Sequence, residues 1–86
     1  MNAFDYRYPA AMFPSTRNVA VTPDDDTHFT PPFRSLYVGT GGNVVIADLH
    51  GGVTTWRNVP DGGYVLSGGT RVMAATTASD IIALTD

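Results

Sequence analysis

The sequence contains no cysteine, no lysine and no glutamate among its 86 residues. The absence of cysteine excludes disulfide bonds and thiolate metal sites, although it says nothing about the redox compartment. Lysine and glutamate are favoured on exposed helix surfaces. Their absence, together with eleven Thr, nine Val and nine Gly, argues against helices and favours β-strands.

Charge of either sign is scarce: only 15% of the residues are charged, and the formal net charge is −3. Nucleic-acid binding needs clustered cations for phosphate contacts, so a mildly acidic chain without lysine argues against it. A low-charge surface on a small domain also indicates that a partner covers part of it. The alternative is a Thr-, Ser- and Gly-rich surface with no partner.

Long hydrophobic runs are missing as well. No stretch approaches the ~20 apolar residues of a membrane-spanning helix, and no signal peptide is visible. We therefore expect a soluble protein that is made in the cytoplasm and has no membrane partner. The length allows one domain with a modest core, for which association with copies or partners is the natural support.

The sequence divides into two zones, an arm over residues 1–18 and a β-domain over residues 19–86. The arm carries four of the nine aromatic residues, and Pro9 and Pro14 interrupt it. Those prolines exclude a regular helix and a central strand, which predicts an extended arm. Disordered linkers are poor in aromatic residues, so this arm has a purpose beyond solubility.

The second zone alternates short strands with turns. Four glycine pairs, at 41–42, 51–52, 62–63 and 68–69, supply the positive φ of hairpin turns. We predict an all-β fold, a small antiparallel sandwich or barrel of six or seven short strands that meander through the middle of the chain. Residues 43–48 have apolar side chains on both faces and are predicted to form a central strand. Residues 34–39, 70–75 and 80–84 are further predicted strands.

Catalytic or metal-binding patterns are not found. His28 has Asp24, Asp25 and Asp26 close in sequence, but the spacing matches neither a zinc site nor a calcium loop. The glycine-rich residues 39–42 lack the lysine and the helix of a phosphate loop, which favours a hairpin turn. We predict no enzyme, no metal and no cofactor.

Aromatic residues carry the clearest functional signal. The predicted partner-binding residues of the arm are Phe4, Tyr6, Tyr8, Met12 and Phe13. They are of the types enriched in interface cores, which favours docking on a neighbour. Folding back over the chain's own sheet is the alternative. Trp56 is predicted to belong to the core, and otherwise to form a sugar-stacking platform with Tyr37 and Tyr64.

Several stretches resemble a family of phage-associated proteins, the spike base proteins on the heads of gene transfer agents and tailed phages. They are AVTPDD at 20–25, RSLYVGTGG at 34–42, WRNVP at 56–60, TRVMA at 70–74 and TTASDIIAL at 76–84. Each stretch is common, and their order and spacing carry the resemblance. The glycine-rich residues 62–69 and the aromatic N-terminus depart from it.

The resemblance implies a small β-domain on the outside of a capsid, with no catalytic residue and no cofactor. We predict a phage structural protein of the virion surface, either a vertex spike base or a cement (decoration) protein. Its expected partners are the major capsid protein or vertex subunits, copies of itself as a trimer or pentamer, and a spike or fibre protein. A carbohydrate-binding module is the alternative, and a small hydrolase with paired Asp residues is a more remote one.

Overall fold

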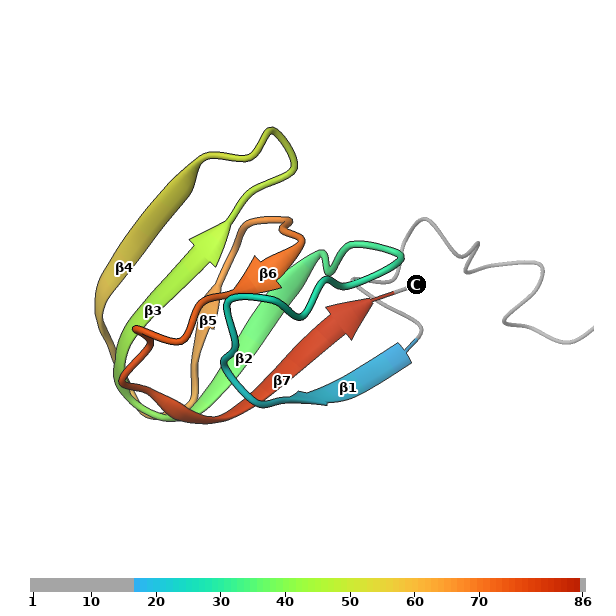
Figure 1. Cartoon of the computed structure of the whole chain (residues 1–86). Coiled ribbons are helices and arrows are strands. Elements are labelled where there is room, and N and C mark those ends of the chain that lie inside the picture. Colours follow the sequence, from blue (N-terminus) through green and yellow to red (C-terminus); the bar gives the residue numbers. More distant parts are fainter. Residues whose placement is uncertain (1–16, 86) are drawn as a thin grey trace, which may run out of the picture.

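The computed structural model describes residues 17–85, which form seven β-strands in two antiparallel sheets (Figure 1). The strands are β1 (Arg17–Val21), β2 (Ser35–Thr40), β3 (Gly42–Ala47), β4 (Val53–Val59), β5 (Gly63–Val65), β6 (Arg71–Val72) and β7 (Ser79–Thr85). This confirms the predicted all-β class. No helix that could cross a membrane occurs within residues 17–85.

The two sheets form a sandwich of four and three strands. The larger has the order β1-β7-β2-β5, and the smaller has the order β4-β3-β6. The predicted meander is wrong, because β2 and β3, which follow each other in sequence, lie in different sheets. The chain also changes sheet between β4 and β5, between β5 and β6, and between β6 and β7.

Glycine pairs therefore mark turns, but mostly not hairpins. Only the pair at 51–52 closes a hairpin, between β3 and β4, and there Gly51 has a φ of 85°. The pair at 41–42 lies where the chain passes from one sheet to the other, which corrects the predicted hairpin turn at 39–42. A Cβ on Gly42 would approach the backbone nitrogen of Ala78 to 2.8 Å. Glycine serves this corner because another segment passes close to it.

The central strand was predicted correctly, whereas the strand over residues 70–75 is shorter than predicted. β3 lies between β4 and β6. β6 has only two residues, because after Val72 threonine side chains take over the hydrogen bonds to β3 that its backbone would otherwise make. The hydroxyls of Thr76 and Thr77 accept hydrogen bonds from the backbone N–H groups of Val45 and Asn43, at 3.0 and 2.9 Å.

A β-bulge in β4 changes which side chains face the core. The register with β3 shifts between the pairs Gly42–Val59 and Val44–Trp56, so β4 contributes one extra residue. Asn58 has a φ of 57° there, and its N–H donates to the Asn43 Oδ1 at 3.1 Å. In a regular strand, residues three apart would face opposite sides. The bulge lets Trp56 and Val59 both pack on the core.

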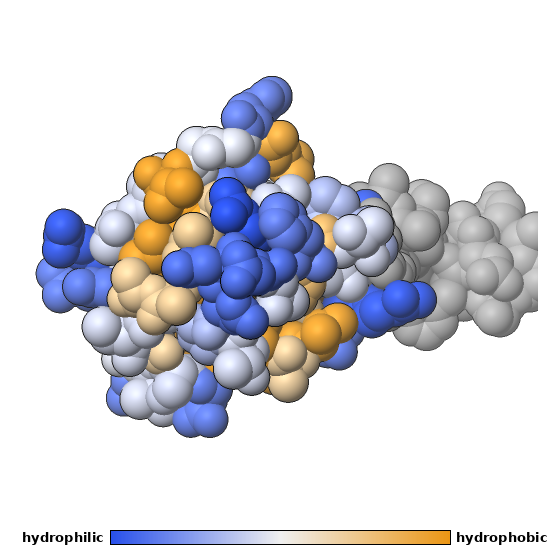
Figure 2. Space-filling model, in the orientation of Figure 1, coloured by the Kyte–Doolittle hydropathy of each residue, from blue (hydrophilic) through white to orange (hydrophobic). Residues whose placement is uncertain are grey.

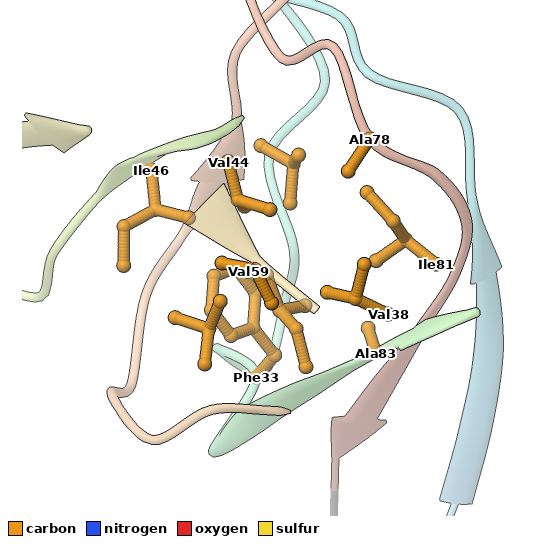
Figure 3. Packing of buried hydrophobic residues seen from close by; sticks show 11 residues of the cluster. Phe33, Val38, Val44, Ile46, Val59, Ala78, Ile81 and Ala83 are labelled. Carbon is orange, nitrogen blue, oxygen red and sulfur yellow. The ribbon is translucent and has the colours of Figure 1, made fainter. Parts of the chain in front are cut away.

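The core fills the space between the sheets (Figure 3). The completely buried side chains come from both layers; they include Leu36, Val38, Val65, Ile81 and Ala83 from the larger sheet and Val44, Ile46 and Val72 from the smaller one. Phe33 joins them from the β1–β2 connection, where its ring packs edge-on against Phe29 at 5.5 Å between centroids. Each fully buried Val, Leu or Ile side chain among them contributes about 1.5–3 kcal/mol relative to an exposed one.

Candidate docking surfaces

No pocket opens in the part of the chain that the structure describes, and no three potential metal-ligating side chains gather there. The candidate sites are therefore surfaces and turns. Four lie within residues 17–85: the Asp-rich turn, the Asp48 turn, the tyrosine pair and the outer side of the four-stranded sheet.

The Asp-rich turn at residues 24–26 is held by its own carboxylates. Asp24 accepts hydrogen bonds from the Asp26 N–H at 3.0 Å and the Thr27 hydroxyl at 3.0 Å. The first of these bonds, supported by the second, lowers the pKa of the Asp24 carboxyl. Asp25 accepts from the Ala74 N–H at 2.8 Å, which fastens the turn to the segment after β6. His28 is exposed beside this turn.

Asp48 organises the hairpin between β3 and β4 in the same way. One carboxylate oxygen, Oδ1, accepts from the N–H groups of His50 at 2.8 Å and Gly52 at 2.9 Å. These two bonds lower the pKa of the Asp48 carboxyl, the His50 bond having the larger effect. His50 and Leu49 are exposed at the tip. Asp24 and Asp48 are thus turn-forming residues by geometry.

Of the three predicted sugar-stacking residues, the structure brings only two together. Tyr37 and Tyr64 face each other across β2 and β5, with 5.6 Å between ring centroids and an interplanar angle of 66°. Trp56 belongs to the other sheet and packs against the core, as the preferred prediction for this residue stated. Because the tyrosine rings meet edge to face, they do not form a flat stacking platform.

The side of the four-stranded sheet that points away from the core carries no charged residue at its centre. One row across the strands contains Tyr64, Tyr37, Ile82 and Ala20, and the next contains Ser35, Leu84 and Asn18. We call these seven residues the outer face. The residues that alternate with them point inward and are buried or packed against the core: Val19, Val21, Leu36, Val38, Val65, Ile81 and Ala83. This face was not predicted from the sequence, because its pattern appears only once the strand order is known.

Hydrophobic residues elsewhere on the surface are scattered. On the face seen in Figure 2, hydrophilic residues cross the centre and separate groups of hydrophobic residues lie around them. Large exposed apolar side chains are Leu49, Val53, Tyr64 and Leu66. Tyr64 belongs to the outer face and is 54% exposed, and Leu66, two residues further along the chain, is 77% exposed. These two residues enlarge the apolar area at the β5 edge.

The predicted arm residues, Phe4, Tyr6, Tyr8, Met12 and Phe13, lie outside the described residues. The described chain begins at Arg17, the first residue of β1, two residues before the predicted boundary at residue 19. β1 is an edge strand of the four-stranded sheet and carries Ala20 and Asn18 of the outer face. The arm therefore joins the domain at the margin of this face.

The uncharged outer face matches the depletion of charged residues in the cores of protein–protein interfaces. No protein-family model matches the chain. No curated protein matches it either.

Among solved structures, the chain is similar to one described as "Capsid of native GTA particle computed with C5 symmetry", a GTA being a gene transfer agent. The identity is 29%, the TM-score is 0.79, and the match covers 98% of this chain and 99% of that chain. The likeness supports a virion structural role and a virion location, and it suggests a non-enzymatic protein.

Proposed function

We propose that this chain is a capsid accessory protein that binds the outside of a phage-like capsid, with its aromatic arm docking on the shell or on a neighbouring subunit. The observation that carries the proposal is the likeness to a chain of a gene transfer agent capsid, which extends over the full length of both chains. The match thus concerns the whole molecule rather than one common substructure. The capsid shell, or the subunits at its vertices, is the proposed partner.

The surface of the domain is consistent with this role. The outer face lacks charge, and the chain as a whole is only 15% charged, so little desolvation of ions opposes contact with a protein partner. A capsid presents the same binding surface many times. Copies that associate with each other on it bind with avidity, without a large interface for each copy.

Two roles on the capsid are compatible with this attachment. A vertex spike base would occupy the five-fold positions and carry a spike or fibre protein, whereas a cement protein would bind across the shell. Electron cryomicroscopy of capsids with the protein bound distinguishes these roles. Density confined to the vertices supports the spike base, and density at repeated sites over the facets supports the cement protein.

The arm is tested by deleting residues 1–13 and by changing four of its aromatic residues, Phe4, Tyr6, Tyr8 and Phe13, to Ser. Capsids of the particle to which the protein belongs, purified without it, are mixed with each variant and sedimented. We expect the full chain to sediment with the capsids and both variants to stay in solution, because the interface anchors are gone.

The matched control replaces Asn2 and Ser15 by Ala, which changes the arm but keeps its aromatic residues. This variant should bind as the full chain does. Circular dichroism and cooperative urea unfolding check that every variant retains the β-domain. Binding by the truncated chain would refute the role of the arm, and failure of the full chain to bind capsids would refute the proposed function itself.

A further inference from the structure

The outer face of the four-stranded sheet is an uncharged surface, apolar or aromatic at five of its seven residues, with no described segment of the chain over it. The three-stranded sheet packs against the opposite side of β2 and β7, where Val38 and Ile81 are buried. The outer face itself has Tyr37 and Ile82 at its centre, and the exposed Tyr64 at one margin. A contiguous apolar face on a small soluble domain marks an interaction site.

A charged boundary limits this face at one end. Asp80, in β7, has a φ of 54°, and its carboxylate accepts a hydrogen bond from the Thr40 hydroxyl at 2.9 Å. A Cβ on Gly39 would lie 2.7 Å from the Asp80 Cβ, so glycine is required opposite it. Between Asp80 and the other end, where β1 begins, all seven residues of the face are uncharged.

The N-terminal arm has the chemistry to cover such a face. Residues 1–16 contain four aromatic residues and two Met, and their only charged side chains are Asp5 and Arg7, whose formal charges cancel. Pro9 and Pro14 interrupt the backbone donors that a continuous edge-strand ladder would need. Docking through side chains on a sheet face suits this segment better than pairing along a sheet edge.

The direction of β1 indicates whose face the arm covers. The arm enters β1 at Arg17, which pairs with Thr85 at the end of β7, so a straight extension of β1 leads beyond the end of its own sheet. To cover its own outer face, the chain would have to reverse within the residues just before Arg17. An extended segment of sixteen residues spans up to ~50 Å, enough to reach a neighbouring domain.

We infer that the outer face binds the N-terminal arm of a second copy of this chain. The arm and the face are different surfaces of one molecule, so the contact is head-to-tail and forms a closed ring when the rotation between copies closes. This inference rests on the proposed function, since it names the surface on which the arm docks. The rows Tyr64–Tyr37–Ile82–Ala20 and Ser35–Leu84–Asn18 are its contact surface.

The test uses the absence of cysteine, which leaves no background thiol. One batch of the full chain carries Ala11→Cys in the arm, and another carries Ala20→Cys, Asn18→Cys or Ser35→Cys on the outer face. The control batch carries Thr55→Cys, exposed on β4 of the other sheet. None of these changes removes an aromatic residue. Each face batch or control batch is mixed with the arm batch and treated with a short bismaleimide cross-linker.

We expect a cross-linked dimer between position 11 and the face positions, identified by peptide mass spectrometry. The yield should exceed that with position 55 at least about tenfold, the ratio for a contact worth ~1.4 kcal/mol. Adding Ile82→Asn to the face batch should lower the yield by a similar factor. Its fold is checked by urea unfolding, and Tyr64→Ser serves as a second face variant.

Two results would overturn the inference. Cross-linking within a chain that carries both cysteines, without cross-linking between the two batches, would mean that the arm covers its own face. Equal yields at position 55 and at the face positions would mean that the face is not the docking site. In either case, capsid binding that still depends on the arm would leave the proposed function standing, because that experiment does not involve the outer face.

Discussion

Gly69 shows how closely single residues fit in this small sandwich. It is buried, and an added Cβ would overlap the Phe33 ring and lie 2.7 Å from the carbonyl oxygen of Ala47. Neither neighbour can move easily, because Phe33 is in the core and the Ala47 oxygen accepts a hydrogen bond from the Thr70 N–H. We expect Gly69→Ala to lower the free energy of unfolding by about 1–3 kcal/mol, measured by urea denaturation.

The adjacent Gly68 provides the control for this substitution. Its Cβ would lie 3.3 Å from the Phe33 carbonyl oxygen and 3.5 Å from the Leu49 side chain, which is exposed and can move. Gly68→Ala should therefore cost less than Gly69→Ala. Equal losses for the two variants would contradict the close packing around Gly69.

Asp48 makes the stability of the hairpin depend on pH. Its pKa is lowered in the folded chain because the ionised carboxylate accepts the His50 and Gly52 N–H groups. A group whose pKa falls on folding stabilises the fold above its unfolded pKa, and this contribution disappears as the pH falls through the folded value. Unfolding should become easier below about pH 4, where the unfolded carboxyl takes up its proton.

The variant Asp48→Asn removes this titration. Its free energy of unfolding, measured in urea at a series of pH values, should fall less steeply below about pH 4 than that of the parent chain. Asp26→Asn is the control, since Asp26 serves the neighbouring Asp24 turn through its backbone N–H. If the free energy of unfolding of the parent chain and of Asp48→Asn fell equally at low pH, the contribution of Asp48 would be disproved.

At the scale of the element, β7 packs one face on the core and presents the other on the outer side of the sheet. It is hydrogen-bonded on both sides, to β1 and to β2. Ile81 points into the core and is 2% exposed, whereas Ile82 lies on the outer face. We expect Ile81→Ala to lower the free energy of unfolding by about 2–5 kcal/mol, because it leaves a cavity.

The neighbouring Ile82→Ala is the matched comparison, since it makes the same chemical change one residue along. Its cost in chemical denaturation should be no more than about 1 kcal/mol, because Ile82 is only partly buried. The same variant should weaken the association of copies through the outer face. A large loss of stability from Ile82→Ala would mean that the two faces were assigned wrongly.

At the scale of the whole molecule, the arm and the outer face together predict a ring. Native mass spectrometry of the full chain should give a closed oligomer of three or five copies, and the chain without residues 1–13 should give monomers. Five copies would fit the five-fold vertices of a capsid, and three would fit three-fold sites or a fibre base. A monomeric full chain would contradict self-association in solution.

Much of the strand content could be predicted from the sequence, because its signals are local. The strands predicted over residues 34–39, 43–48 and 80–84 all appear in the structure, as β2, β3 and β7. The bulge at Asn58 and the deep burial of Phe33 were missed. Both depend on segments far away in sequence: β3 and Asn43 for the bulge, and the Gly69 region for Phe33.

The sequence by itself determined the all-β class, the positions of most turns and the lack of a disulfide or thiolate metal site, because composition and local periodicity fix these properties. Only the tertiary structure decided which strands share a sheet. A glycine pair fixes where the chain turns, but the partner of a strand depends on contacts distant in sequence. The outer face follows from that pairing, since its seven residues come from four strands that only the sheet brings into register.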